Sequence, residues 1–344
     1  MKALNLHGIN KLVYEEVQTP KAGEGEVLLK IRACGICSSD EERVLKTGTY
    51  HFPTIPGHEF AGEIVEVGTG VEDRYLGKRA SVFPLLPCRM CSACEKGEYA
   101  MCSSYKYFGS RNDGGFAEYL AVPLWNIILL DDTIDFKVGA LMEPAAVALH
   151  AVNIGDVKKD DHVAIIGTGT IGILIGAFCK IKGAHVYVCG RRRESLEKAE
   201  EFGFETICMN NLSAEVGKAT NGERMDIVFE AVGSNEAMES AIMSTSTAGV
   251  VVAVGNPKGD FMLSKDVYWK ILRWQLQVRG TWNSDYNEKK NDWKEVAELM
   301  KENGFPFEKL ITKTYNLNEY QKAFDDLTDK TMAKTKLMFV MNEE

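Results

Sequence analysis

The sequence predicts an α/β protein that combines a doubly wound parallel β-sheet with a second, β-rich domain. Three observations support this fold class. An apolar run at 163–166 leads directly into three closely spaced glycines, and short apolar runs then alternate with helix-like segments. By contrast, residues 1 to about 123 carry short stretches of alternating apolar and polar residues bounded by Gly and Pro, which is typical of antiparallel strands.

The apolar run Val163–Ile166 suits a strand that is buried on both faces. Gly167, Gly169 and Gly172 follow in the pattern Gly-x-Gly-x-x-Gly, which permits a tight turn and a close approach of the backbone to a pyrophosphate. The first turn of the next helix, which includes Ile171, supplies free N–H groups for phosphates. The turn therefore predicts a dinucleotide site. An α/β core without a ligand is the alternative.

The alternation continues along the chain, as expected for parallel strands joined by helices. We expect strands at 184–189, 226–233, 249–255 and 276–281, with helices at 173–181 and 194–202. This order places the glycines at the carboxyl end of the first strand, where sheets of this kind bind nucleotides.

The end of the second strand predicts which dinucleotide is preferred. A unit that binds NAD carries Asp or Glu about twenty residues beyond the glycines, where the carboxylate holds the ribose hydroxyl. Here Gly190 is followed by Arg191 and Arg192, which could pair with a 2′-phosphate. The pattern predicts a preference for NADP, with NAD as the alternative cofactor. An exposed basic turn without a ligand is the competing interpretation.

Length and charge limit the classes of function. A chain of 344 residues is long enough for two domains. Its net charge of −9, without a long run of Lys or Arg, argues against a nucleic-acid partner. Neither a signal peptide nor eighteen consecutive apolar residues are found, so we expect no membrane span and a cytoplasmic location.

The β-rich part contains a candidate catalytic metal site. Cys37 is followed by the pair His58-Glu59, so that a thiolate, an imidazole and a carboxylate are available. Zinc prefers these ligand types, and a catalytic site uses three of them and leaves a fourth position open. A His-Glu-x-x-His protease motif is excluded because position 62 is Gly62.

Cys34 and Cys37 also form a Cys-x-x-Cys pair, which in another context is a redox dithiol. We discount that role, because a thioredoxin-like pair opens a helix after a strand, whereas this stretch is interpreted as turn-rich. Cys34 is expected to be a small buried residue.

Four of the nine cysteines form a second set with the spacing C-x2-C-x2-C-x7-C. Four thiolates within fifteen residues predict a closed, structural zinc site: Cys88, Cys91, Cys94 and Cys102. An iron–sulfur cluster is disfavoured because the ferredoxin run places its fourth cysteine three residues after the third, whereas the interval here is seven.

Two polar residues elsewhere are also candidates. Arg111 could pair with a substrate anion or face water, and Glu143 interrupts an apolar run and needs a partner.

Together these motifs resemble the zinc-dependent medium-chain dehydrogenases over essentially the whole chain. Within that family the sequence is most similar to the polyol branch, which includes sorbitol dehydrogenases and galactitol-1-phosphate 5-dehydrogenases. The motifs that carry the family resemblance are 35–40, 57–59, 88–102, 142–144 and 167–172, and those that carry the polyol branch are 84–88, 109–119, Glu143 and 270–273.

The resemblance implies a chaperonin-10-like β-barrel catalytic domain at 1–150 that is completed by 286–344, with a Rossmann domain at 151–285. It further implies a hydride transfer between a nicotinamide cofactor and a secondary alcohol of a polyol or polyol phosphate, of the galactitol-1-phosphate or sorbitol type. Two zinc ions per chain are expected, together with a homodimer or homotetramer joined through late strands of the sheet.

The resemblance also assigns roles. Cys37 and His58 become catalytic zinc ligands, with Glu59 and Glu143 as the candidates for the remaining position. Asp40 would accept a hydrogen bond from His58, and Ser39 would pass the substrate proton towards solvent.

Contacts with the substrate are expected from Ser39, Arg111 and Glu143. Ser38 departs from the Gly that is common at its position in the family. Two alternatives remain: a zinc-dependent alcohol or threonine dehydrogenase of the same fold, and a zinc-stapled module that binds nucleic acid or protein.

Overall fold

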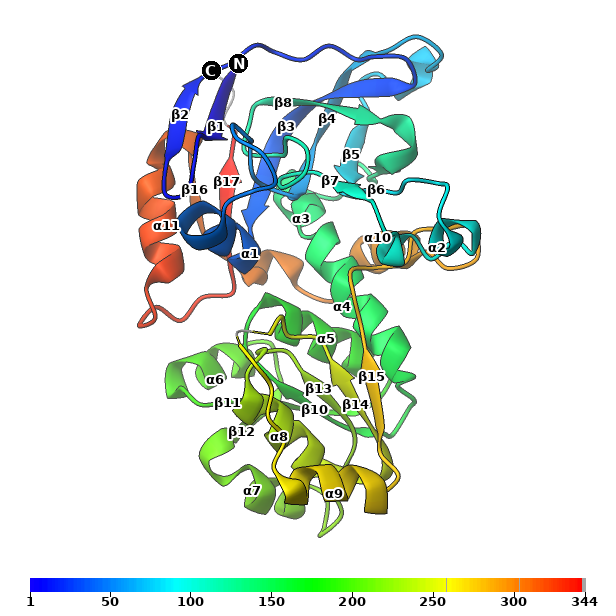
Figure 1. The fold of residues 1–344 in the computed structure, drawn as a ribbon, viewed down its shortest axis with the longest axis vertical. Helices are drawn as coiled ribbons and strands as arrows, with labels where there is room; N and C mark the ends of the chain where they lie inside the picture. Colours follow the sequence, from blue (N-terminus) through cyan, green and yellow to red (C-terminus); the bar gives the residue numbers. More distant parts are fainter. Residues whose placement is uncertain (258, 303, 342–344) are drawn as a thin grey trace. The chain divides into compact units, whose positions relative to one another are not determined.

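The structure is a computed structural model that describes residues 1–257, 259–302 and 304–341 (Figure 1). The chain divides into two compact units. One contains residues 1–143 and 285–344, and the other contains residues 144–284. The predicted segment 286–344 ends in three residues, 342–344, that lie outside the described part of the chain.

The first unit is built around a seven-stranded sheet. Its longest strand, β3 (Glu26–Ile36), pairs in antiparallel fashion with β4 (Glu59–Val67), β8 (Tyr119–Pro123) and β17 (Lys336–Val340). The sheet order is β16-β17-β3-β4-β5-β9, with β8 on β3. Figure 1 shows β17, from the end of the chain, beside β3. The other strands are β5 (Arg79–Val82), β9 (Ile127–Leu129) and β16 (Ile311–Tyr315).

Smaller elements surround this sheet. Two short antiparallel pairs are formed by β1 (Lys2–Leu6) with β2 (Leu12–Glu16) and by β6 (Leu85–Leu86) with β7 (Lys106–Tyr107). The helices are α1 (Ser38–Glu42), α2 (Ser92–Glu95), α3 (Phe136–Ala140), α10 (Asp292–Lys301) and α11 (Tyr320–Thr328). A π-helical turn, Arg43–Thr47, follows α1. Short 3-10 turns lie at Asp73–Tyr75, Tyr99–Met101, Leu124–Asn126, Phe307–Leu310 and Leu317–Glu319.

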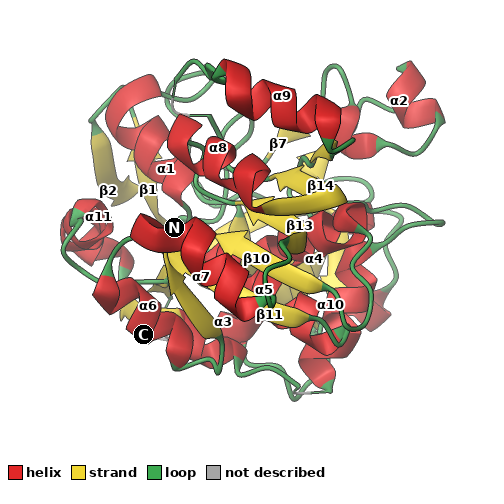
Figure 2. Ribbon diagram, turned by 90° about the horizontal axis from the view of Figure 1, so that it is seen from below, coloured by secondary structure: helices red, strands yellow, loops and turns green. Residues whose placement is uncertain are grey.

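The second unit is a parallel six-stranded sheet with the order β12-β11-β10-β13-β14-β15. Its strands are β10 (His162–Ile166), β11 (His185–Gly190), β12 (Glu205–Cys208), β13 (Met225–Glu230), β14 (Thr245–Ala253) and β15 (Gln277–Gly280). Helices alternate with them along the chain: α4 (Met142–Gly155), whose first two residues belong to the other unit, α5 (Thr170–Ile181), α6 (Arg193–Glu200), α7 (Leu212–Ala219), α8 (Asn235–Ser244) and α9 (Lys265–Arg273). Figure 2 shows α5 and α8 against the strands of this sheet. A 3-10 turn lies at Met209–Asn211. The predicted α/β class is confirmed.

The predicted strand at 226–233 is shorter in the structure, for a local reason. β13 ends at Glu230, whose Oε1 accepts hydrogen bonds from the backbone N–H groups of Val232 and Gly233, both at 2.7 Å. These bonds fold the chain back on the glutamate side chain and so end the strand, although the sequence stays apolar. Among the described residues, no helix is both long enough and apolar enough to cross a membrane.

Candidate active site and metal centres

Sheet register assembles the first candidate metal centre. β3 ends at Ile36, and Cys37 is the residue that precedes α1. The antiparallel neighbour β4 begins at Glu59, opposite Gly35, so His58 and Glu59 lie beside the end of β3. The potential ligand atoms of Cys37, His58 and Glu59 all lie within 4.8 Å of one another. A thiol, an imidazole and a carboxylate at this separation fit a zinc ion.

The local structure corrects the sequence-based description of the Cys-x-x-Cys pair. Cys34 lies inside β3 and Cys37 opens α1, so the stretch is a strand followed by a helix, and the interpretation as turn-rich was wrong. The difference arises because residues 33–36 are all buried and pair with β17, which keeps the strand extended up to Ile36. Cys34 is fully buried, as expected, and this burial raises the pKa of its thiol well above the ordinary value. A buried thiol of this kind is a poor redox nucleophile.

Asp40 orients the imidazole of His58. One Asp40 oxygen, Oδ2, accepts a hydrogen bond from the backbone N–H of Cys37 at 3.0 Å. The other, Oδ1, lies 3.3 Å from His58 Nδ1, which leaves Nε2 to face a metal. Burial opposes the charge on both groups, but their mutual attraction prevails: the pKa of Asp40 is lowered and the pKa of His58 is raised well above its usual value.

Lys336, the first residue of β17, holds the carboxylate of Glu59. Its Nζ lies 2.6 Å from both Glu59 oxygens, and the two side chains are 5% and 1% exposed. Burial alone would lower the pKa of Lys336, yet the Glu59 charge raises it. Sequence reasoning missed this residue. The only signal was a charged residue at the start of an apolar strand, 277 positions from its partner.

Glu143 lies in the first turn of α4 and is buried. Its Oε1 accepts a hydrogen bond from the hydroxyl of Tyr107 at 3.1 Å. Burial raises the pKa of Glu143 to about 7. In the described part of the chain, the cluster of possible metal ligands around Cys37 includes Glu59 and does not include Glu143.

Arg111 is held between two aromatic rings. Its guanidinium carbon lies 4.2 Å from the ring centre of Tyr50 and 4.5 Å from that of Tyr105. Nη1 donates to the Tyr105 carbonyl and Nη2 to the Tyr50 hydroxyl, both at 3.0 Å. The Tyr105 ring meets the Tyr107 ring at 6.2 Å, and Tyr107 meets His58 at 5.7 Å. A line of aromatic contacts thus joins Arg111 to His58 in the first candidate metal centre.

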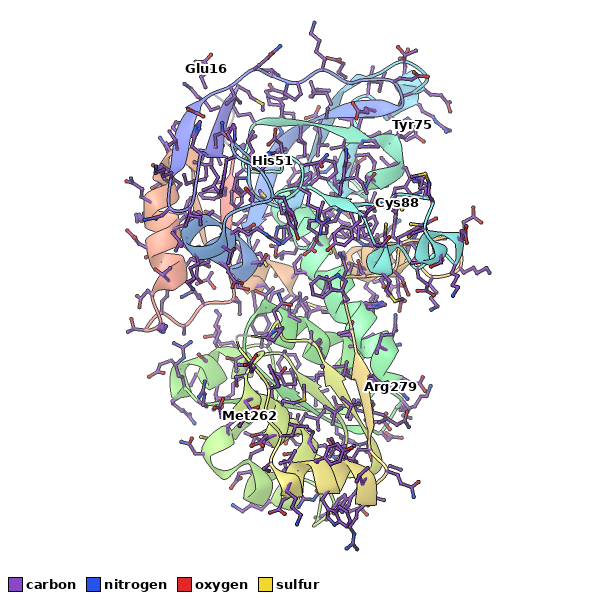
Figure 3. The ribbon with its side chains drawn as sticks, in the orientation of Figure 1. Glu16, His51, Tyr75, Cys88, Met262 and Arg279 are labelled. Carbon is purple, nitrogen blue, oxygen red and sulfur yellow. The ribbon has the colours of Figure 1, made fainter. Side chains whose placement is uncertain are left out.

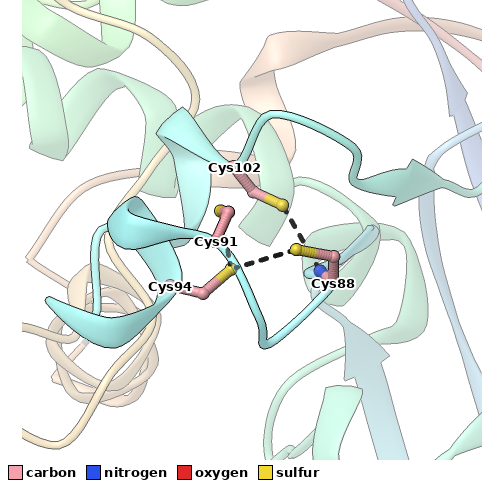
Figure 4. Close-up of side chains that lie close together, drawn as sticks. All are labelled: Cys88, Cys91, Cys94 and Cys102. Carbon is pink, nitrogen blue, oxygen red and sulfur yellow. Dashed lines mark hydrogen bonds between the residues drawn. The ribbon is translucent and has the colours of Figure 1, made fainter.

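The four-cysteine set forms the second candidate metal centre (Figure 4). The sulfur of Cys94 lies 3.9 Å from that of Cys88 and 3.6 Å from that of Cys91, and the Cys88 backbone N–H donates to the Cys102 sulfur at 3.3 Å. Four sulfurs bound tetrahedrally at about 2.3 Å from one zinc would be about 3.8 Å apart. All four cysteines are free thiols within one cluster, so the set fits a closed zinc site.

Local structure sets the geometry of this cluster. Cys88 lies between β6 and α2 (Figure 3). Cys91 is the N-cap of α2, and Cys94 lies within its single turn. Hydrogen bonds from the backbone N–H groups of Cys94 and Ser103 lower the pKa of Cys91 to about 5. Burial, together with the neighbouring thiols, raises the pKa of Cys94 to about 12. The set therefore provides one ready thiolate, and a bound cation would favour deprotonation of the others.

The glycine turn of the second unit lies between β10 and α5. β10 ends at Ile166, and Gly167 has a φ of +131°, which an L-residue with a side chain rarely adopts. A Cβ on Gly172 would lie 2.1 Å from the Gly167 carbonyl oxygen, so α5 can approach the turn this closely only with glycine there. The space around Gly169 is open, and Ile171 is half-buried in the first turn of α5. The open backbone at the helix N-terminus suits a pyrophosphate.

The basic residues lie at the carboxyl end of the next strand. Gly190 ends β11, and a Cβ there would lie 2.8 Å from the Thr168 side chain, so this residue sits against the glycine turn. Arg191 and Arg192 follow, both exposed, and Arg192 precedes the first residue of α6. The structure thus brings the two arginines to the same edge of the sheet as the turn.

Comparison with known proteins identifies the class. Two family models match, the alcohol dehydrogenase GroES-like domain over residues 23–132 and the zinc-binding dehydrogenase domain over residues 170–302. The chain is 33% identical to galactitol 1-phosphate 5-dehydrogenase of Escherichia coli K12 over 314 residues, covering 90% of this chain and 91% of the relative. It is 32% identical to (R,R)-butanediol dehydrogenase of Bacillus subtilis over 337 residues, 93% of each chain.

Solved structures agree with these relatives. Galactitol-1-phosphate dehydrogenase from E. coli superposes with a TM-score of 0.91 at 30% identity, covering 99% of this chain and 100% of that one. A Sinorhizobium meliloti protein described as a zinc-binding dehydrogenase, solved with NADP, gives 0.91 at 27% identity and 99% coverage of both chains. Another, an alcohol dehydrogenase from E. coli CFT073 in complex with NADH, gives 0.90 at 26% identity, also with 99% coverage of both.

The fold and the matching family models define an oxidoreductase with a GroES-like domain and a Rossmann-like parallel sheet. The chain belongs to the zinc-binding alcohol dehydrogenase family. The resemblance inferred from the motifs is confirmed. These relatives are dehydrogenases, so they do not support the alternative of a module that only binds nucleic acid or protein.

Proposed function

We propose that the chain is a zinc-dependent dehydrogenase that acts on a secondary alcohol of a polyol or polyol phosphate, of the galactitol-1-phosphate or sorbitol type. The observation that carries this proposal is the gathering of Cys37, His58 and Glu59 within 4.8 Å. When bound, zinc supplies a Lewis acid that acidifies a hydroxyl group, and the nicotinamide cofactor supplies the hydride chemistry. Residues 1–143 with 285–344 would carry the catalytic groups, and residues 144–284 would hold the cofactor.

Within this proposal each side chain has one task. Cys37 and His58 hold the metal, and Asp40 keeps the His58 ring turned so that Nε2 faces it. Glu59 can be the third metal ligand only if Lys336 releases one of the two Glu59 carboxylate oxygens that it now holds. Ser39, half-buried in α1, would take the proton of the substrate hydroxyl.

Glu143 and Arg111 are proposed as substrate contacts. Glu143 would accept hydrogen bonds from the substrate hydroxyls while Tyr107 holds its other side. Arg111 would bind the anionic end of a phosphorylated substrate. Its guanidinium uses one bond from each terminal nitrogen, and no carboxylate of the described residues forms an ion pair with it, so further N–H groups can face a phosphate.

We further propose that the cofactor is preferentially NADP. Arg191 and Arg192 stand at the end of β11, where an NAD-binding unit places its carboxylate. Catalytic efficiency measured with NAD and NADP tests this proposal. Replacing both arginines with Ala should lower the efficiency with NADP and leave that with NAD nearly unchanged. A wild-type preference for NAD would refute it.

A homo-oligomer, either a dimer or a tetramer, is proposed from the edge of the second unit. β15 is the last strand of its sheet, and Val278 on it is 49% exposed. The neighbouring part of the unit carries further exposed apolar side chains, namely Met262, Tyr268, Trp269 and Leu272. Exposed edges and apolar patches of this kind are usually covered. Light scattering that reports a monomer at micromolar concentration would contradict the proposal.

A cytoplasmic location is proposed as well, because the nine cysteines are free thiols grouped as metal ligands or placed singly, which suits a reducing compartment.

The proposed activity is tested by assaying zinc-loaded protein with both cofactors against polyols, polyol phosphates, butanediol and threonine. We expect the highest kcat/KM with a polyol or polyol phosphate. A clear preference for threonine or a simple alcohol would refute the substrate class.

A further inference from the structure

Arg43 makes two contacts at the proposed catalytic centre that no motif in the sequence indicates. It opens the π-helical turn after α1, four positions beyond Ser39, and residues at this spacing lie on one helical face. Arg43 Nη1 donates a hydrogen bond to Ser39 Oγ at 2.9 Å. The same nitrogen lies 3.5 Å from Asp40 Oδ1. The Arg43 side chain is 25% exposed and Asp40 is fully buried.

The first contact determines what the Ser39 hydroxyl can do. A serine hydroxyl has one proton to donate and two lone pairs that can accept, whereas a guanidinium only donates. Arg43 therefore occupies one lone pair of Ser39 and cannot receive its proton. The remaining lone pair is left to accept a proton from a substrate hydroxyl, and the proton that Ser39 gives up passes to solvent water on the side away from Arg43, since Ser39 is half-buried.

The second contact concerns the charge of Asp40. This buried carboxylate faces two cationic groups among the described residues, His58 and Arg43. Arg43 is not a ligand of the proposed metal site, so it supplies a positive charge beside Asp40 whether or not a metal is bound. A buried carboxylate without a counter-charge is costly.

We propose that Arg43 is a positioning residue for the dehydrogenase reaction: it fixes the Ser39 hydroxyl for proton transfer and holds Asp40 against His58. This inference rests on the proposed function, because the orientation of Ser39 matters only if Ser39 takes the substrate proton. The other cation of this turn, Lys46, is 63% exposed and pairs with Glu41, so it serves as a matched control.

A double-mutant cycle between Arg43 and Ser39 tests the kinetic part. Arg43→Gln should lower kcat by about 10–100-fold with a smaller change in the substrate KM, as expected for a group that orients a reacting one. In the Ser39→Ala background the same substitution should cost far less, because the hydroxyl that Arg43 orients is absent. Arg43→Lys, which keeps the charge and a donor, should restore part of kcat, and Lys46→Gln should change nothing. An equal loss in both backgrounds would overturn the proposal.

A crystal structure of Arg43→Gln gives a readout that does not depend on activity. We expect the Ser39 side chain to occupy more than one staggered rotamer, whereas in the wild-type protein it should occupy one. A single, unchanged Ser39 rotamer in Arg43→Gln would refute the positioning role even if no alcohol is oxidised. A wild-type protein that is inactive with every alcohol, but whose Ser39 loses its single rotamer in the variant, would instead refute the proposed function alone. If Arg43→Gln fails to fold, Arg43→Lys is used for both the kinetic and the crystallographic measurement. A partial loss of kcat is then expected in the protein that keeps Ser39 and not in the Ser39→Ala protein.

Discussion

The two candidate metal centres differ in how the chain builds them. The closed set takes all its ligands from Cys88–Cys102, a segment of fifteen residues. The open set takes Cys37 from the end of β3, His58 and Glu59 from the start of β4, and a counter-charge from Lys336 at the start of β17. A structural metal site can therefore be encoded by spacing alone, whereas the open site depends on sheet register between distant segments.

The surroundings of the two centres differ in the same sense. The closed set consists of thiols whose hydrogen bonds come from backbone N–H groups and from one another. The open set is enclosed by buried charges, Asp40, Glu143 and Lys336, that can orient ligands and move protons. We infer that the closed set stabilises the fold and that the open set performs the chemistry.

The largest effect is expected at the open set. Replacing Cys37 or His58 with Ala removes a ligand, so the Lewis acid is lost and kcat should fall by about 10⁴-fold or more, equivalent to several kcal/mol of transition-state stabilisation. The melting temperature should change little in Cys37→Ala, because the β3–β4 pairing does not depend on this side chain. His58→Ala should lower it somewhat, because it also removes a partner of the buried Asp40. Steady-state assays and thermal unfolding of the same preparations check both halves. A variant that keeps a tenth of the activity would contradict this role.

The reverse pattern is expected at the closed set. Cys91→Ala should lower the free energy of unfolding by about 4 kcal/mol or more, because structural zinc contributes directly to folding. Turnover per folded molecule should stay within a few-fold of wild type. Cys208→Ala is the matched control, since Cys208 lies in β12 outside both sets. Equal unfolding temperatures for the two variants would show that the closed set has no structural role.

A smaller effect is expected for the buried ion pair. Lys336→Met leaves the Glu59 charge without its partner, which should cost about 3 kcal/mol of stability. The double variant Lys336→Met with Glu59→Gln removes that charge and should recover part of the loss. Chemical denaturation of the three proteins measures both quantities. If the double variant is less stable than Lys336→Met alone, the unpaired Glu59 charge is not the cause of the lost stability.

The smallest effect is a difference in how the two sets respond to pH. Zinc must displace the proton of His58, whose raised pKa makes that proton more tightly held, so zinc should leave the open set as the pH falls from neutral. In the closed set the pKa of Cys91 is about 5, so this thiolate persists to lower pH and offsets the raised pKa of Cys94. Zinc released to a chelator between pH 7 and about pH 5 should therefore come mainly from the open set, and activity should be lost before melting temperature. Simultaneous loss of both would contradict the comparison.

How much the sequence could predict follows from the same difference. The glycine turn and the four cysteines are local patterns: the structure gathers the four sulfurs in one cluster and places the glycines between β10 and α5. The partner of Glu59 could not be predicted, because Lys336 meets it only through the pairing of β17 with β3 and of β3 with β4. The contact between Arg43 and Ser39 was missed for another reason, since a helix continuing past Glu42 was not expected in a stretch interpreted as turns.

The central claim is that one chain carries two separate zinc sites with different tasks, and zinc content tests it most directly. Elemental analysis of undamaged wild-type protein should return two zinc ions per chain, and Cys37→Ala should return one while retaining the wild-type melting temperature. One zinc or fewer in the wild-type protein, or an unchanged zinc content in Cys37→Ala, would contradict the account.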